Sequence, residues 1–326
     1  MQLLPKSKKI LALSGGVGGA KLALGLSHCL SADQLTVVTN TADDFEHLGL
    51  SISPDLDTVM YTLAGINDQE RGWGISGESW TNLAALERLG VDTWFQLGDQ
   101  DLATHLIRTQ LRTSGKSLSE ATAYLCSQLG VSARVLPMSD DPVRTMVVTE
   151  RGEIGFQQYF VKERCEPKVS GFRFAGVDVA AAHPEFLSLL RDESLAGVVI
   201  CPSNPFVSVE PLLALDGVRE ALSKCHAPVI AVSPIVGGRA IKGPTAKMMQ
   251  ELSMPTSATA VAKYYGDILD CFVLDDADAS ESYAIQAMGI DTLVTPTVMQ
   301  SLQDRIELAD QVIQYATCFA RQDLVV

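Results

Sequence analysis

A glycine-rich turn near the N-terminus constrains the fold more than any other feature of this chain. An apolar stretch at 9–13 leads into Ser14-Gly-Gly-Val-Gly-Gly-Ala-Lys21, and an apolar helical pattern follows over 20–30. This order predicts a buried strand, a tight turn and a helix that begins at the turn. Bare glycines let backbone N–H groups approach an anion, and the N-terminus of a helix favours negative charge. The turn therefore indicates an α/β fold with a phosphate site.

The rest of the chain alternates short apolar strands with helical patterns. Further strands are predicted over 35–39, 196–201, 228–232, 271–274 and 291–294, and further helices over 56–64 and 298–321. Strands that alternate with helices favour a mainly parallel sheet covered by helices on both faces. We therefore expect a Rossmann-like α/β fold.

The middle of the chain departs from this alternation. Residues 80–130 are mostly helical in pattern, and Ser117-Leu-Ser-Glu120 has the form of a capping box. Two β-rich stretches, 145–149 and 154–161, flank a turn and predict a β-hairpin. We expect one domain over 1–326 with a smaller helical and β-hairpin insertion subdomain near 80–190.

Composition excludes several functional classes. The formal net charge of the 326 residues is −14, which argues against non-specific binding of nucleic acid. No apolar run approaches the roughly 20 residues that cross a bilayer, and the N-terminus has no signal-peptide pattern. Seven scattered cysteines form no C-x-x-C pair, which is typical of a reducing compartment. We expect a cytoplasmic protein with no membrane or nucleic-acid partner.

The glycine turn matches neither of the two common phosphate-binding patterns. Ala20 stands where a P-loop needs its second glycine, and Lys21 replaces the third glycine of a dinucleotide fingerprint. A nicotinamide oxidoreductase is therefore disfavoured, although a tight turn without a ligand stays open. The candidate residues for a diphosphate are Gly15, Gly16, Gly18, Gly19 and Lys21.

Four carboxylates follow the glycine turn within fifteen positions. Asp43 and Asp44 come directly after the predicted strand 35–39, at the end of a parallel strand where α/β folds bind ligands. Asp55 and Asp57 follow in Ser53-Pro-Asp-Leu-Asp-Thr58. Convergent carboxylates can hold Mg²⁺ with retained water. Acids at the start of a helix also complement its dipole, so the residue types alone leave a metal site and helix capping equally open.

Two later loops also follow predicted strands. Ser203 and Asn204 lie in the first, and Ser233, Gly238 and Arg239 lie in the second, which also carries Lys242. These residues are candidates for the nucleotide. The alternatives are hydrogen bonds to the local backbone in the first loop and a solvated basic loop in the second.

Eight short motifs together resemble one known family. They are Ser14-Gly-Gly-Val-Gly-Gly-Ala-Lys21, Thr41-Ala-Asp-Asp44, Ser53-Pro-Asp-Leu-Asp-Thr58, Arg71-Gly-Trp-Gly74, Leu97-Gly-Asp-Gln-Asp-Leu-Ala-Thr-His105, Leu136-Pro-Met-Ser-Asp140, Pro202-Ser-Asn-Pro205 and Val232-Ser-Pro-Ile235. In this order they are similar to the 2-phospho-L-lactate transferase family (CofD) of coenzyme F420 biosynthesis, and the resemblance covers nearly the whole chain.

The resemblance implies a Mg²⁺-dependent transferase, commonly a homodimer. A ribityl hydroxyl of the deazaflavin Fo would attack the phosphorus of a guanosine diphosphate-activated acid, and GMP would leave. The acid would be of phospholactyl, phosphoenolpyruvyl or phosphoglyceryl type. A second implied possibility is a regulator of the same superfamily that binds a nucleotide-sugar without turnover. Such regulators lack Ser-Pro-Asp-Leu-Asp-Thr and Arg-Gly-Trp-Gly, and both motifs are intact here.

The resemblance also assigns residues. Asp57 and Gln96 match positions that contact Fo, and some relatives carry Lys in place of Gln96. We expect Asp43, Asp44 and Asp57 to form the catalytic and metal-binding set. Asp55 is then expected to be a structural acid at the start of its helix.

Overall fold

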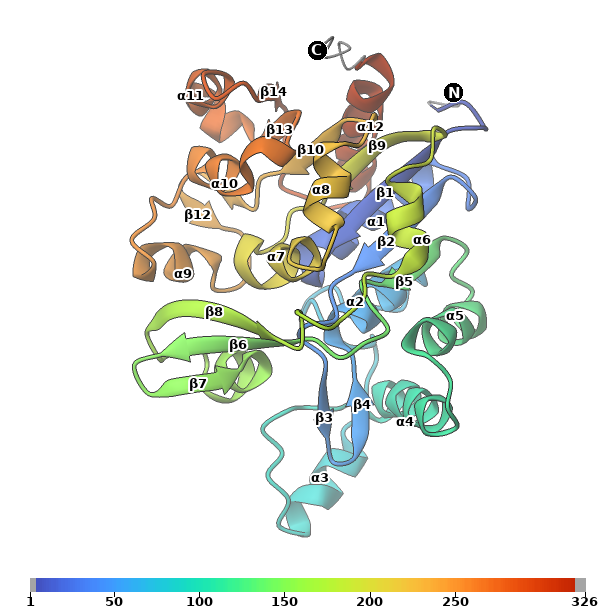
Figure 1. Ribbon diagram of the computed structural model, residues 1–326. Coiled ribbons are helices and arrows are strands. Elements are labelled where there is room, and N and C mark those ends of the chain that lie inside the picture. The colour runs from blue at the N-terminus through green and yellow to red at the C-terminus, as the bar shows by residue number, and fades with distance from the viewer. Residues whose placement is uncertain (1–3, 320–326) are drawn as a thin grey trace.

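The computed structural model describes residues 4–319, and a seven-stranded parallel sheet lies at its centre (Figure 1). The pairing is parallel at every step. In spatial order the strands are β5 (Arg134–Pro137), β2 (Leu35–Thr39), β1 (Lys9–Ser14), β9 (Leu195–Ile200), β10 (Val229–Val232), β13 (Cys271–Leu274) and β14 (Asp291–Val294). The predicted strands are confirmed, and β5 is an additional one.

The direction of strand order changes at the centre of this sheet. From β1 the chain first builds outward through β2 and β5, and it then returns to add β9, β10, β13 and β14 on the other side. This is the arrangement of a Rossmann-like fold, in which the loops that follow the two central strands leave a crevice between them. The predicted fold class is confirmed.

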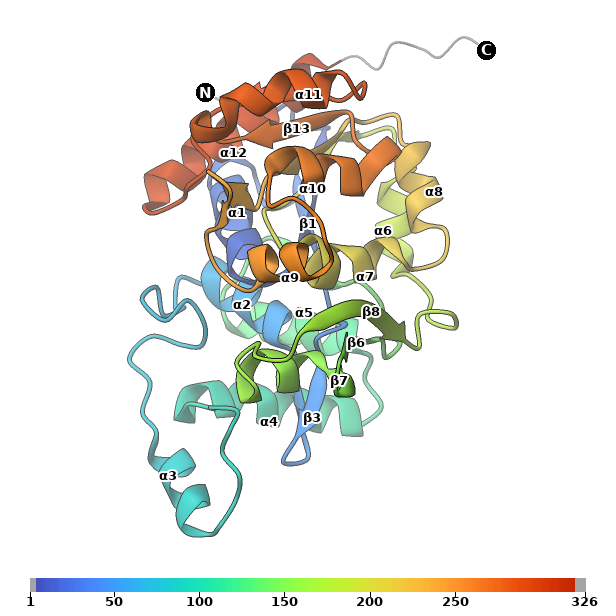
Figure 2. The same cartoon turned by 90° about the vertical axis from the view of Figure 1, so that its left-hand side faces the viewer.

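Helices cover both faces of the sheet, as Figure 2 shows with α1 and α12 on one side and α6 and α8 on the other. The first layer consists of α1 (Gly16–Cys29), α2 (Pro54–Leu63), α5 (Leu118–Gln128) and α12 (Leu302–Cys318). The second consists of α6 (Pro184–Leu189), α7 (Glu210–Leu213), α8 (Val218–Ser223), α9 (Thr245–Glu251) and α10 (Ala258–Tyr265).

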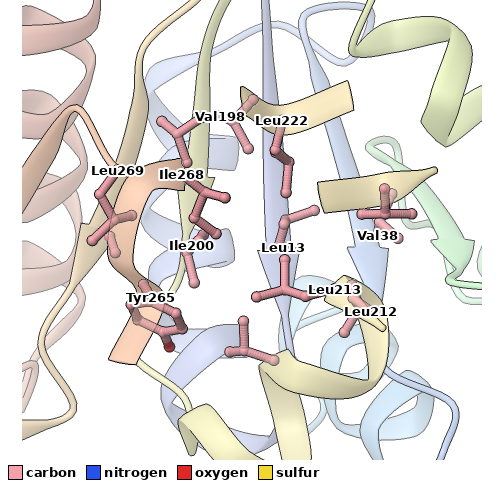
Figure 3. Close-up of a cluster of buried hydrophobic side chains, with 14 of the residues drawn as sticks. Leu13, Val38, Val198, Ile200, Leu212, Leu213, Leu222, Tyr265, Ile268 and Leu269 are labelled. Atoms are coloured by element: carbon pink, nitrogen blue, oxygen red, sulfur yellow. The ribbon is translucent and has the colours of Figure 1, made fainter. Parts of the chain in front are cut away.

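The core divides into two layers because successive strand residues point to opposite faces. In β1, Leu11 and Leu13 belong to one buried cluster, whereas Ile10 and Ala12 belong to the other. In the first cluster, strand residues pack beneath the helices that carry Leu212, Leu213, Leu222 and Tyr265 (Figure 3). Each fully buried leucine stabilises the fold by about 1.5–3 kcal/mol relative to an exposed one.

The segment between β2 and β9 contains most of the structure outside the central layers. It includes α3 (Thr81–Arg88), α4 (Asp99–Thr113) and an antiparallel sheet of β6 (Arg144–Thr149), β7 (Gly152–Gly155) and β8 (Val169–Ala175). The predicted hairpin is confirmed, but its second strand is short because a π-helix, η1 (Gln158–Lys162), follows it. A separate insertion subdomain stays a prediction.

Short elements complete the described chain. They are β3 (Phe45–His47), β4 (Leu50–Ile52), η2 (Pro205–Val209), β11 (Ile235–Val236), β12 (Arg239–Ala240), η3 (Gly266–Ile268), η4 (Asp276–Glu281) and α11 (Ser282–Gln286). Among residues 4–319, no helix has the length and apolar character that a membrane span requires.

Capping explains two of the helix starts. The predicted capping box is confirmed, since Ser117 Oγ accepts from Glu120 N at 3.1 Å and the Glu120 carboxylate accepts from Ser117 N at 2.9 Å. A second capping box pairs Ser301 with Asp304 and starts α12 at Leu302, later than the predicted 298. Residues 320–321 of that predicted helix lie outside the described part of the chain.

We expect Gly25→Ala to destabilise the fold by about 1–3 kcal/mol, because a methyl group there would overlap the backbone carbonyl of Arg305 where α1 packs against α12. Urea unfolding measures this change. Ser27→Ala, nearby on α1, is the control and should change the free energy of unfolding by less than about 0.5 kcal/mol. Equal stability of Gly25→Ala and wild type would contradict the close helix contact.

Candidate active site

A cavity of about 660 Å³ opens where β1, β2, β9 and β10 end. It brings together most of the predicted site residues from six separate segments. Those that line it are Gly15, Gly16, Gly18, Lys21, Asp43, Asp57, Gln96, Ser203, Asn204 and Ser233. The remaining four, Gly19, Asp44, Gly238 and Arg239, are not part of the lining.

The glycine turn is held against the loop that follows β9. Ser203 Oγ donates to the Gly15 carbonyl at 2.6 Å and lies 3.3 Å from Gly15 N. A side chain at Gly18 would overlap the carbonyl of Pro202, and Gly16 has φ +62°, which favours glycine. Helix α1 begins at Gly16, earlier than predicted, so its first turn faces the cavity.

Gly19 has a packing role. A Cβ at this position would overlap Ser14 Oγ and press on Ser203 Oγ. Because glycine has no Cβ, α1 can lie close to the ends of β1 and β9. Gly19 does not line the cavity, so its predicted contact with diphosphate stays a prediction.

Asp43 and Asp55 form a buried pair of carboxylates. Asn40 Nδ2 donates to Asp55 Oδ2 at 3.0 Å, whereas Asp43 Oδ1 has no hydrogen-bond partner. Burial, and then the negative charge of Asp55, raise the pKa of Asp43 well above its usual value. Burial raises the pKa of Asp55 to about 6. Two acids that repel each other in a closed site favour a bound cation.

Asp55 lies at the start of its helix, as expected, and it also lines the cavity. Both Asp55 and Asp57 lie in the first turn of α2, and both line the cavity. Ser53 is the N-cap residue, yet its hydroxyl donates to Asp44 Oδ2 at 2.7 Å and does not cap the helix. Asp44 is buried outside the cavity, and burial raises its pKa to about 7.

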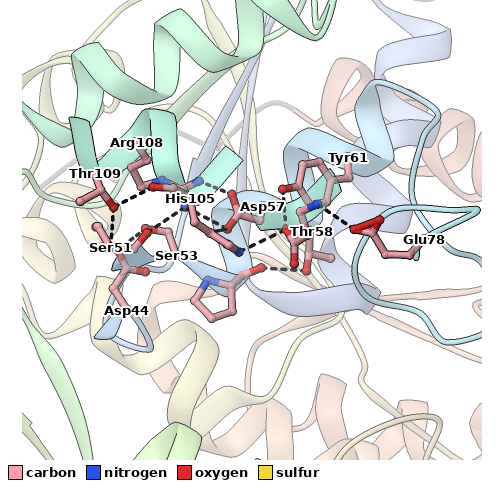
Figure 4. A network of polar contacts seen from close by, with 12 residues as sticks. Asp44, Ser51, Ser53, Asp57, Thr58, Tyr61, Glu78, His105, Arg108 and Thr109 are labelled. Atoms are coloured by element: carbon pink, nitrogen blue, oxygen red, sulfur yellow. Dashed lines mark hydrogen bonds and ion pairs between the residues drawn. The ribbon is translucent and has the colours of Figure 1, made fainter. Parts of the chain in front are cut away.

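Asp57 is paired with a cation that the sequence did not reveal. Arg108, on α4, is fully buried and donates from one nitrogen to Asp57 Oδ2 at 3.0 Å and from another to Asp57 Oδ1 (Figure 4). The same side chain lies 3.2 Å from His105 Nδ1. A two-point ion pair fixes a carboxylate in one orientation. Asp57 is thus tied to α4 and has its charge already neutralised.

A second polar group extends this network along the cavity wall. His105 Nε2 lies 3.2 Å from Asp101 Oδ1, and Tyr61 donates its hydroxyl to the same oxygen at 2.7 Å. Burial favours the neutral acid, but the interactions with His105, Tyr61 and Arg108 together outweigh it and lower the pKa of Asp101. The Asp101–His105 spacing of four residues on a helix could have signalled this pair, because such residues share a face.

The predicted three-carboxylate metal set is not assembled. Within residues 4–319, no group of three or more His, Cys, Asp or Glu side chains is arranged to hold a metal ion. Asp43 and Asp55 nevertheless fit Mg²⁺, which usually binds one or two carboxylates and keeps several waters. Asp44 and Asp57 have other partners, Ser53 and Arg108.

Aromatic side chains form the opposite part of the cavity wall. Trp94 and Phe95 precede Gln96, and their rings lie 5.6 Å apart. Phe156 and Phe160, at the end of the small sheet, stack at 5.5 Å and line the same space. Flat apolar surfaces of this kind suit a planar ring system.

Three of the predicted nucleotide residues already have local partners. Asn204 Oδ1 accepts from Phe206 N at 2.9 Å and caps η2. Ser233 Oγ donates to the Ile235 carbonyl at 2.7 Å. Ser203 holds the glycine turn as described above. All three line the cavity, but their first role is to shape its loops.

The chain is similar to known proteins over nearly its whole length. Residues 10–313 match the family model described as 2-phospho-L-lactate transferase CofD. The chain belongs to the CofD family. It is 40% identical over 305 residues to the 2-phospho-L-lactate transferase of Methanosarcina mazei, covering 94% of this chain and 99% of that protein. It is 39% identical over 308 residues to the phosphoenolpyruvate transferase of Kitasatospora aureofaciens, covering 92% and 95%.

The protein is thus a CofD-type transferase of coenzyme F420 biosynthesis, as the motifs indicated. A solved UPF0052 family member from Bacillus halodurans has the same fold, with a TM-score of 0.60. The two chains are 15% identical, and the alignment covers 94% of this chain and 98% of that one.

We expect the ligand-free protein to lose stability as pH rises from about 4 through about 7. Unfolded aspartates titrate near 3.9, whereas Asp43, Asp44 and Asp55 bind their protons more tightly when folded. Protonation therefore stabilises the fold, and this gain disappears above the raised pKa values. Asp55→Asn should reduce this pH-dependent loss of stability by about 1–3 kcal/mol.

Urea unfolding at about pH 4.5 and about pH 8, in buffer that contains a chelator, measures this change in the free energy of unfolding. The exposed Asp178→Asn variant is the control and should follow wild type. An equal pH dependence in Asp55→Asn and wild type would contradict the charged pair.

Proposed function

We propose that this protein transfers a phospho-acid group from a guanosine diphosphate-activated donor to the ribityl hydroxyl of Fo and releases GMP. The observation that carries the proposal is that a single cavity joins a glycine turn, a carboxylate pair and an aromatic wall. Relatives named 2-phospho-L-lactate transferase and phosphoenolpyruvate transferase support this reaction class. The acid is of phospholactyl, phosphoenolpyruvyl or phosphoglyceryl type.

The donor occupies the side of the cavity that contains the glycine turn. Gly15, Gly16 and Gly18 present backbone at the N-terminus of α1, where a diphosphate is favoured. Lys21 adds a positive charge to this side. Ser203, Asn204 and Ser233 belong to the loops that would enclose the guanosine.

Asp43 and Asp55 would hold Mg²⁺ between the donor and the acceptor. When bound, the ion neutralises charge on the diphosphate and on the transferring phosphoryl group. The two carboxylates also stop repelling each other once a cation lies between them.

The acceptor occupies the aromatic side. The deazaflavin ring would lie against Trp94, Phe95, Phe156 and Phe160, with Gln96 at its edge. Asp57, fixed by Arg108, accepts a hydrogen bond from the attacking hydroxyl and orients it. Positioning of this kind accounts for much of the catalysis in phosphoryl transfer.

The assembly and location are part of the same proposal. We expect a cytoplasmic homodimer that binds small molecules and no nucleic acid, because the net charge of −14 disfavours a polyanion.

Incubation with Fo, Mg²⁺ and each activated acid in turn, with detection of GMP, tests the function. We expect release with one acid class, and Asp57→Asn should lower turnover at least about 100-fold because the hydroxyl loses its orienting carboxylate. Asparagine still accepts one hydrogen bond from Arg108 but removes the counter-charge of this buried cation, so the melting temperature should fall while the melting curve stays cooperative. Absence of GMP with every donor would favour a regulator that binds nucleotide without turnover.

Calorimetry with Mg²⁺ alone tests the metal site. Asp43→Asn and Asp55→Asn should each weaken Mg²⁺ binding at least about tenfold, because each removes a charged ligand. Asp44→Asn is the matched control, since Asp44 is equally buried but lies outside the cavity lining. A larger loss of affinity in Asp44→Asn than in the other two would contradict the assignment.

A further inference from the structure

Three positive charges gather beside the glycine turn. Lys21 and Lys242 both line the cavity, and Arg305 of α12 lies behind them with 4% of its surface exposed. Lys21 Nζ donates to the Met299 carbonyl at 2.8 Å. Burial, followed by the charges of Arg305 and Lys242, lowers the pKa of Lys21. The charges of Arg305 and Lys242 therefore both act on Lys21.

This group of cations forms no direct ion pair with any acid in the described chain. Within residues 4–319, none of the three cations forms an ion pair, and Arg305 Nε is buried without a hydrogen-bond partner. The charge of Asp304 offsets part of the positive charge of Lys21 and Arg305, and the same carboxylate accepts from Ser301 N at 2.7 Å in the capping box of α12. Arg305 is buried, Lys21 is half-buried, and Lys242 is exposed, and both lysines line the cavity. A cavity wall that carries this excess of positive charge favours an anionic ligand.

Lys242 lies at the junction of two cavity loops. A Cβ at Gly72 would overlap the Lys242 ammonium and lie 3.6 Å from Val17 of the glycine turn. Gly72 also has φ +82°. The glycine in Arg71-Gly-Trp-Gly74 thus leaves space for this ammonium next to the turn.

Arg239 provides an internal comparison. It lies in the same loop as Lys242 and is exposed, but it is not part of the cavity lining. The sequence placed both Arg239 and Lys242 in the candidate nucleotide loop, and of the two Lys242 lines the cavity.

We propose that Lys242, together with Lys21, binds the phosphate of the departing GMP; this inference rests on the proposed transfer reaction. The ribityl oxygen forms a bond to the phosphorus that carries the acid, and the bond from that phosphorus to the bridging oxygen breaks. The bridging oxygen leaves with GMP, and the hydroxyl proton is released to solvent. The two ammonium groups stabilise the negative charge that develops on the leaving phosphate, and Arg305 strengthens the field from behind.

Binding of GMP and of guanosine to the full-length protein tests the contact. Lys242→Met keeps about the length of the side chain and removes its charge. It should therefore weaken the binding of GMP about 10- to 100-fold and leave the affinity for guanosine unchanged. Lys242→Arg should restore part of the affinity. Arg239→Met is the matched control and should bind GMP as wild type does.

Gly72 allows a second, independent test through a double-mutant cycle. Gly72→Ala should displace the Lys242 ammonium and weaken the binding of GMP. In the Lys242→Met background it should have little further effect on GMP affinity. Gly65→Ala is the backbone control, because Gly65 has φ +71° with open space around it. It should leave GMP affinity unchanged.

The outcomes separate this inference from the proposed function. Wild-type affinity for GMP in Lys242→Met, or additive effects of the Gly72 and Lys242 substitutions, would overturn the inference and leave the transfer reaction standing. Failure of the wild-type protein to bind GMP would overturn both. Tight GMP binding that depends on Lys242 supports the inference even if the transferred acid is still to be identified.

Discussion

The close contact between the glycine turn and the loop after β9 determines where every other part of the site can lie. Gly18 leaves room for the Pro202 carbonyl, and Ser203 Oγ contacts both the N–H and the carbonyl of Gly15. Because these loops follow the two central strands of the sheet, the cavity opens beside them. The carboxylates, the cations and the aromatic wall are then placed by the neighbouring strand ends and by the segment between β2 and β9.

Most of the fold could be predicted because its strands are short, apolar and separated by clear helical patterns. The exceptions have physical reasons. β5 begins at the exposed Arg134 and ends at Pro137, so its apolar signal is only two residues long. Residues 158–162 are rich in β-forming side chains but fold as a π-helix, because Tyr159 is buried in the core there.

The site was predicted less completely, and the carboxylates show why. Asp55 and Asp57 have equivalent positions by local rules, since both lie in the first turn of α2. Their roles differ because Asn40 contacts one and Arg108 the other, and Arg108 is 51 positions further along the chain. Local sequence rules carry no information about such partners. The family resemblance identified Asp57 and Gln96 as site residues, but it did not supply the side chains that position them.

The contact between Gly15 and Ser203 also has a consequence for the order of assembly. The two residues are 188 positions apart, and β1 pairs with β9 across a similar separation. Contacts this distant in sequence form late, because a long loop must close first. During synthesis, the N-terminal turn is therefore made early but cannot acquire its ligand-binding shape until the chain beyond residue 203 has emerged. The final shape of the turn, and with it the nucleotide site proposed above, therefore depends on the pairing of β1 with β9.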